Sequence, residues 1–286
     1  MAIKRYFSNA DNTITNSLLE NLTTRATGSN MGQADTLEVF SIYGQSGSSE
    51  STYSSELSRI LIQFPMGNIS SDRSSGKLPS SGSVSFYLKL YNLEHISTTP
   101  RNYKLTVNAI SGSWEEGNGV DFNSYTDLTY DKIGSNWIRR TGSTSWSTAG
   151  GDYYTDISSS FEQEFPIGTE NLEIDITTLV EQWVNSPGNQ AVLGSKNNHG
   201  LLIKLSSSYE ASSSSNLYGA VESYYKKTFY GRGSDNFFAR PVLEARWNSS
   251  RRDNRGNFYF SSSLAPAEDN LNTLFMYNYI RGQLKD

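Results

Sequence analysis

Short runs in which apolar and polar residues alternate with a period of two constrain the fold of this chain most strongly. In Val84–Leu90, every second residue is apolar, beginning with Val84. Successive side chains of a β-strand point to opposite faces, so this pattern gives a strand one apolar face. Similar runs rich in β-branched and aromatic residues predict strands at 3–8, 12–19, 36–43, 59–64, 84–91, 104–110, 171–176, 200–205, 226–230 and 240–247.

Many short strands without intervening helices indicate antiparallel sheets. We therefore expect an all-β protein, an antiparallel jelly-roll-like β-sandwich with one short helix and a C-terminal β extension. The composition agrees, because Tyr (18) and Phe (13) are abundant while charged residues make up only 19% of the chain. Loops are expected in the polar segments 45–55, 70–82, 112–124, 141–156 and 206–215.

One segment has helical periodicity. Asp175, Thr177 or Thr178 can cap its N-terminus, and Thr178 with Glu181 fits the capping-box pattern. We expect a helix within 175–184 that lies across the end of the sandwich and closes the core with Trp183. Its apolar face would contain Leu179, Val180, Trp183 and Val184.

The charged segment 249–256 predicts a boundary between a β-sandwich at 1–248 and a linker with a C-terminal β extension at 249–286. Two strands are expected in the extension, at 257–261 and 274–280. Because two strands alone are marginally stable, they would pack on the sandwich, pair with another chain or begin a further domain. The candidate assembly contacts are Phe258, Phe260, Phe275, Tyr277 and Tyr279.

Several motifs together resemble the DNRLRE-type β-sandwich family over about residues 1–248. The stretch LEIDITTLVEQW at 172–183 is similar to that family's strand-then-helix element, and SWEEG at 113–117 is similar to its W-x-E-G element. NHGLLI at 198–203 and RPVLEARW at 240–247 resemble its later strands. The resemblance implies that Trp114 lies in the core and that a neighbouring Glu holds the loop. The expected structural core residues are Trp114, Leu179, Trp183 and Trp247.

The chain also resembles structural proteins of contractile-tailed marine phages, cyanophages especially, in MAIKRYF at 1–7 and SSSLAPA at 261–267. This resemblance implies a role in surface attachment or particle architecture. In many such proteins further β-domains follow the first one, so this chain is either a short version or a trimmed one. The family also includes carbohydrate-binding relatives.

The residues that could carry chemistry are few. The chain has no Cys and two histidines, His95 and His199, so thiolate sites and disulfides are excluded. Serine is too abundant for its proximity to histidine to indicate a triad, and no G-x-S-x-G motif occurs. Glu115 and Glu116 would point to opposite faces of an extended chain, whereas glycoside hydrolysis needs two carboxyl groups across one cleft. We expect no catalytic residue and no metal site.

A calcium site in the acidic loop 115–121 is the one cofactor alternative, because Ca²⁺ binds carboxylate and carbonyl oxygens. Such loops are more often simple turns. The net charge of −5 without a basic stripe argues against nucleic acid as a partner. No apolar run is long enough to predict membrane insertion.

Aromatic residues are dense in several segments, including Trp137 and Trp146. Exposed rings could bind glycan or lie in a subunit interface, and the candidates are Tyr225, Tyr230 and Phe238. We expect a non-enzymatic virion structural protein of a tailed phage, a capsid decoration, collar or tail component made in the host cytoplasm. Its expected partners are other virion proteins and copies of itself, with a trimer among the candidate assemblies. The alternative functions are a carbohydrate-binding module for host surface glycan and an enzyme such as a polysaccharide lyase or esterase.

Overall fold

The computed structural model describes residues 2–19, 21–43, 55–94, 99–120, 134–185, 196–210, 225–249, 278–280 and 283–285. The chain divides into two compact units, Ile3–Trp247 and a smaller one made of Met1–Ala2 and Asn248–Asp286. Among the described residues, no helix has the length and apolarity needed to cross a membrane.

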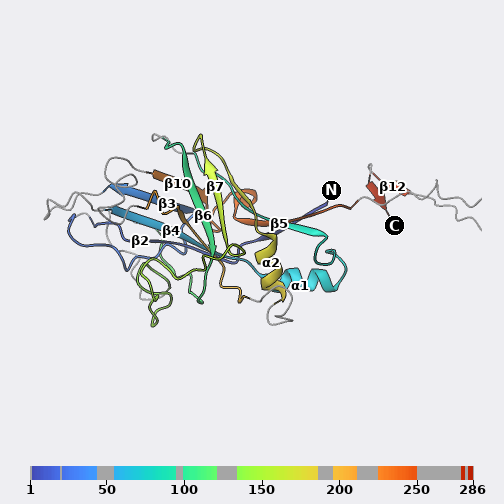
Figure 1. Cartoon of the computed structure of the whole chain (residues 1–286), viewed down its shortest axis with the longest axis horizontal. Coiled ribbons are helices and arrows are strands. Elements are labelled where there is room, and N and C mark those ends of the chain that lie inside the picture. Colours follow the sequence, from blue (N-terminus) through green and yellow to red (C-terminus); the bar gives the residue numbers. More distant parts are fainter. Residues whose placement is uncertain are drawn as a thin grey trace, which may run out of the picture. The chain divides into compact units, whose positions relative to one another are not determined.

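The larger unit contains two antiparallel sheets (Figure 1). The first has the order β1 (Ala2–Phe7), β11 (Val242–Trp247), β5 (Val84–Leu90) and β8 (Leu172–Asp175). The second has the order β10 (Tyr225–Tyr230), β3 (Thr36–Tyr43), β4 (Ser55–Gln63), β9 (Leu201–Leu205), β6 (Tyr103–Ala109) and β7 (Ser160–Phe165), and β2 (Ala10–Thr15) also pairs with β4.

Eight of these strands follow the jelly-roll order. Numbered along the chain, β1, β4, β5, β6, β7, β8, β9 and β11 give one sheet of order 1-8-3-6 and another of order 2-7-4-5. This is the arrangement of two Greek keys that defines a double-sheet jelly roll. The expectation of an all-β sandwich is confirmed, and β2, β3 and β10 extend its second sheet.

The core forms where the inner faces of the two sheets meet. Val84, Phe86, Leu88 and Leu90 are all buried, as their alternation predicts. A second, smaller apolar cluster contains Ile14, Leu57, Leu61, Ile110, Trp137, Trp146 and Leu202. Adjacent residues of β4 therefore enter different clusters, which explains its continuous apolar run. Trp137 and Trp146 are thus buried side chains and not exposed rings.

The expected helix is present as α2 (Thr177–Asn185), and Trp183 lies in the main core. Asp175 Oδ1 accepts hydrogen bonds from the backbone N–H of Thr177 at 2.9 Å and from its hydroxyl at 2.6 Å. Glu181 does not form the expected capping box, because the Glu181 carboxylate binds both terminal nitrogens of Arg73, at 2.7 and 2.9 Å.

Arg73 belongs to α1 (Met66–Ser74), which overlaps the segment expected to be a loop. The described residues thus contain two short α-helices and not one, and these lie side by side at one end of the sandwich (Figure 1). The sequence of α1 is polar, and its buried residues are Met66 and Ile69. Its amphipathic signal is therefore too weak to predict a helix.

The second sheet curls, so that side chains from its distant strands meet. The ring of Tyr103 on β6 stacks on Phe165 of β7, with centroids 5.2 Å apart, and contacts Tyr225 of β10 at 5.9 Å. Strand β7 was not expected from the sequence, because only Phe161 and Phe165 among its six residues are apolar.

In the smaller unit, β12 (Asn278–Ile280) pairs with β13 (Gln283–Lys285) in an antiparallel hairpin. Tyr279 lies in β12 opposite Leu284. The other candidate assembly contacts, Phe258, Phe260, Phe275 and Tyr277, lie outside the described residues.

Candidate interaction surface

A cluster of three aromatic rings, two of them exposed, lies at β1, one of the two edge strands of the four-stranded sheet. We call Phe7, Phe237, Phe238 and Arg240 the aromatic edge. Phe238 is 72% exposed and Phe237 is 48% exposed. The centroid of the Phe237 ring lies 4.5 Å from that of Phe7 and 5.7 Å from that of Phe238. The Arg240 guanidinium carbon lies 5.4 Å from the Phe237 centroid.

Local hydrogen bonds hold these rings outward. Phe237–Ala239 form a single 3-10 turn in which the Ala239 N–H donates to the Asn236 carbonyl at 3.0 Å. Arg240 Nε donates to the Ser234 carbonyl at 2.8 Å. Ala239 is buried and anchors the turn. The two phenylalanines are therefore presented on a fixed turn beside the edge of the sheet.

The outer face of the same sheet carries a network of charges. Glu244 accepts hydrogen bonds from Arg5 at 2.9 Å and from Arg246, and Arg246 also binds Glu173 at 2.6 Å. Burial of the Glu244 side chain acts to raise the pKa of its carboxyl, but the hydrogen bond from Arg246, the charge of Lys89 and the hydrogen bond from Arg5 together outweigh it and hold that pKa below its usual range. This face is thus polar and internally paired, in contrast to the aromatic edge.

A polar cluster with two buried and two partly exposed members joins loops from distant parts of the chain. We call Asp11, Asn30, Glu116 and Arg232 the polar junction. The Glu116 carboxylate binds the Arg232 guanidinium at 2.8 and 3.0 Å and accepts from the Asp11 N–H at 2.7 Å. Asp11 Oδ2 accepts from the Arg232 N–H at 2.6 Å. Burial raises the pKa of Asp11 to about 7. Sequence reasoning missed this cluster.

Glu115 and Glu116 hold different loops. Glu115 Oε2 accepts from the Gly142 N–H at 3.0 Å, whereas Glu116 binds Arg232 in the polar junction. The acidic side chains of loop 115–121 that the structure describes therefore already have protein partners, and Asp121 lies outside the described residues. Within the described ranges, no group of three or more His, Asp or Glu side chains could hold a metal ion.

The expected core residues belong to two apolar clusters. Leu179 and Trp183 are buried in the main core, and Trp247 packs against its margin. Trp114 is partly buried against the second cluster, and its Nε1–H donates to the His199 carbonyl at 2.7 Å. Burial lowers the pKa of the His199 imidazole, and nearby Arg140 lowers it further. The other histidine, His95, lies outside the described residues.

The three candidate contact rings are not brought together. Phe238 belongs to the aromatic edge, whereas Tyr225 and Tyr230 are partly buried at opposite ends of β10. The Tyr225 ring lies edge-on to that of Tyr209, with centroids 4.9 Å apart. The sequence indicated Phe238, but nothing in it placed Phe7 beside Phe237, because these residues are far apart in the chain.

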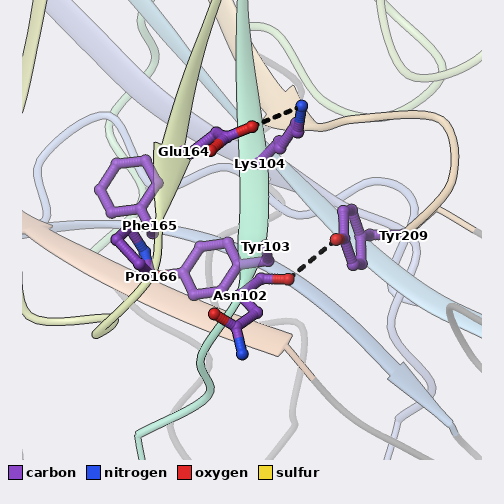
Figure 2. A pocket seen from close by; sticks show the side chains of 7 residues that line it. All are labelled: Asn102, Tyr103, Lys104, Glu164, Phe165, Pro166 and Tyr209. Atoms are coloured by element: carbon purple, nitrogen blue, oxygen red, sulfur yellow. Dashed lines mark hydrogen bonds and ion pairs between the residues drawn. The ribbon is translucent and has the colours of Figure 1, made fainter.

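A shallow pocket of about 240 Å³ opens near this tyrosine pair (Figure 2). An ion pair of 2.7 Å joins Lys104 and Glu164 on one side, and the Tyr209 hydroxyl donates to the Asn102 carbonyl at 2.8 Å on the other (Figure 2). Tyr103 and Phe165 are buried beneath it. Pro166 also lines the pocket. Tyr209 is thus the partly exposed ring that a ligand could contact.

Comparison with protein families and with curated proteins assigns no function to this chain. No protein-family model matches the sequence. No curated protein matches it either. The resemblance to DNRLRE-type and phage proteins stays a prediction from the motifs.

Proposed function

We propose that this chain is a non-enzymatic structural protein of a tailed-phage particle, a capsid decoration, collar or tail component. It would act without a cofactor, through contacts with other virion proteins and with copies of itself. The observation that carries the proposal is the aromatic edge, a fixed cluster of exposed rings with an arginine beside a sheet edge. The phage setting rests on the sequence motifs, and jelly rolls are common in viral capsid and lectin domains.

The composition of the aromatic edge favours a protein partner. Single exposed apolar residues are normal, but clustered aromatic rings with arginine are typical of the centres of protein interfaces. Full burial of Phe237 and Phe238, which are 48% and 72% exposed, would stabilise a complex by on the order of 5 kcal/mol before the cost of association. That contribution is large enough for two residues to control assembly.

The edge strand provides a rigid frame for this contact. Lys4 and the Tyr6 hydroxyl both bind Asp72 of α1, the hydroxyl at 2.8 Å. The Ser8 N–H donates to the Pro241 carbonyl at 3.1 Å, just after the Arg240 of the aromatic edge. A partner would therefore meet a surface that is already ordered, and this reduces the entropy lost on binding.

The proposal is tested by size-exclusion chromatography with light scattering on the chain and its Phe237→Ser/Phe238→Ser variant. We expect the wild type to form a multimer and the double variant to be a monomer with unchanged thermal stability. Ile157→Ser is the matched control, because Ile157 is 95% exposed and lies outside the aromatic edge. A wild type that stays monomeric at ~100 μM, or a double variant that assembles normally, would contradict the proposal.

A carbohydrate-binding function is the second candidate, favoured by the pocket of Figure 2. Sugars stack on exposed rings, and Tyr209 offers one beside the polar pair of Lys104 and Glu164. Its test is a glycan array with the wild type and the Tyr209→Ala variant. Binding that is lost in this variant and kept in the Phe237→Ser/Phe238→Ser variant would favour the glycan function over assembly through the aromatic edge.

A further inference from the structure

Lys227 occupies a core position of β10. It lies between Tyr225 and Phe229 on the face of the strand that points into the curled sheet, and it is only 2% exposed. Its Nζ lies 5.1 Å from the centroid of Phe165 and 5.3 Å from that of Phe229. A lysine is rarely buried in this way unless its amine is well paired.

The partners of this amine are both amide oxygens. Nζ donates to Asn92 Oδ1 at 2.6 Å and to the Gly168 carbonyl at 2.8 Å. Within the described part of the chain, no carboxylate lies within ion-pair distance of Nζ, and Glu170 acts on it only through its more distant charge. Because Nζ contacts Asn92 Oδ1 at 2.6 Å, the side-chain carbonyl carbon of Asn92 lies at most one C=O bond length, about 1.2 Å, further from Nζ than this oxygen does.

Backbone pairing holds Asn92 in this position. Asn92 forms an antiparallel bridge with Phe229, and the Leu93 N–H donates to the Thr228 carbonyl at 3.0 Å. The Asn92 N–H donates to Asn171 Oδ1 at 2.8 Å. Lys227 is therefore the diagonal neighbour of Asn92, two residues from the directly opposite Phe229, a distance that a long side chain spans.

We infer that Lys227 and Asn92 form an intramolecular isopeptide cross-link. The unprotonated amine would attack Cγ of Asn92, so that the Nζ–Cγ bond forms and the Cγ–Nδ2 bond breaks. A proton from Nζ leaves with Nδ2 as ammonia. The balance is one amine plus one carboxamide giving one secondary amide plus ammonia, and it requires no oxidant, metal or other reactant.

Two properties of the site favour this reaction. Fixed partners replace a bimolecular collision with an intramolecular one, and effective molarities in well-oriented systems are very high. Burial lowers the pKa of the Lys227 amine to about 8, against the opposing effect of Glu170, so a large share of the amine is nucleophilic in mildly alkaline solution.

The route for ammonia is short. Asn92 is partly exposed, and together with Gly168 it lines a pocket of about 160 Å³. Among the described residues, no acidic side chain is hydrogen-bonded to Asn92 Oδ1 to polarise its carbonyl, so we expect formation over hours and not seconds. The product would tie β10 covalently to the segment that follows β5, in a chain that has no cysteine for a disulfide.

The test is intact-mass spectrometry of the purified full chain, denatured after incubation at mildly alkaline pH. We expect a mass one ammonia below that of the sequence, and a proteolytic map in which the peptide of Asn92 is joined to that of Lys227. Chain kept in urea throughout should retain its full mass, because the reaction needs the folded geometry.

Lys226→Met is the matched control, because Lys226 forms a surface ion pair of 2.9 Å with Glu38 and should leave the mass loss unchanged. Lys227→Met and Asn92→Ser should abolish it. A folded wild type that keeps its full mass overturns the inference. So does a mass loss that persists in Lys227→Met, since this would come from succinimide formation at an asparagine without the lysine amine. The wild-type mass and peptide map decide the question even where a variant does not fold.

Discussion

Replacement of Asp11 by Asn should stabilise the protein at neutral and alkaline pH. The Asp11 side chain is 1% exposed, and its carboxylate accepts a hydrogen bond from the Arg232 N–H at 2.6 Å. The Arg232 guanidinium binds Glu116 instead, and the charge of Glu116 also opposes ionisation of Asp11. The amide introduced by Asp11→Asn would keep an oxygen for the Arg232 N–H and would remove the buried negative charge.

The magnitude follows from the pKa of Asp11, which burial raises from 3.8 to about 7. The folded state therefore keeps a proton between these values, and stability falls as pH rises through this window. Above pH 7 the full cost is on the order of 4 kcal/mol. We expect Asp11→Asn to recover about 2 kcal/mol at pH 8, because the amide is itself costly to bury. Between pH 8 and pH 4.5 the cost of the buried charge falls by about 3 kcal/mol, so near pH 4.5 the variant should be about 1 kcal/mol less stable than the wild type.

Urea unfolding of both proteins at these two pH values measures the difference. Asp156→Asn is a control of opposite sign. Burial acts to raise the pKa of Asp156, but hydrogen bonds from Lys196 and Ser158 outweigh it and lower that pKa to about 2. That variant should lose stability at pH 8. If Asp11→Asn is destabilised equally at both pH values, the ionised Asp11 contributes favourably and the reasoning is refuted.

Four other changes test the packing of the fold. Gly32→Ala should lower the free energy of unfolding by at least about 2 kcal/mol, because the new Cβ would overlap backbone atoms of the polar junction. Gly67→Ala should raise the free energy of unfolding by about 0.5–1 kcal/mol, because Gly67 lies in α1 with open space around it. Glu210→Gln should lower the free energy of unfolding by about 3–5 kcal/mol, because it leaves a buried arginine and lysine without their shared carboxylate. An unchanged midpoint of urea unfolding would contradict this expectation. Trp183→Ala should lower the free energy of unfolding by about 3–5 kcal/mol, because Trp183 lies in the main core. If calorimetry shows a smaller loss than the replacement of an exposed residue causes, Trp183 lies outside the core.

The parts of the fold that could be predicted are those with a local period. Val84–Leu90 alternates and is buried on alternate residues, and the apolar residues of the segment 175–184 recur at helical spacing within α2, Thr177–Asn185. Strand β7 and helix α1 were missed because both are held by long-range contacts. Phe165 of β7 stacks on Tyr103, and Arg73 of α1 binds Glu181 of the other helix. Neither contact leaves a periodic trace in its own segment.

The candidate surface was predictable only in part, for the same reason. Phe238 was singled out as an exposed ring, but the aromatic edge exists because β1 and β11 are neighbours in the sheet although they lie at opposite ends of the sequence. Sequence position therefore indicates which ring could be exposed. The sheet order decides which rings meet.

Strand β2 shows where reasoning from hydrophobic pattern must fail. Four of its six residues, Asp11, Asn12, Thr13 and Thr15, are polar and at most 1% exposed. They can be buried because distant groups satisfy them: Asn12 Nδ2 donates to the Ser135 carbonyl at 2.9 Å, across 123 residues of sequence. A pattern method reads such a strand as solvent-facing, since it sees polarity and not the partners. The glycines at 32, 117 and 134 leave room for these loops to meet, because a side chain at any of them would overlap atoms of Asn30, Glu116 or Gly117.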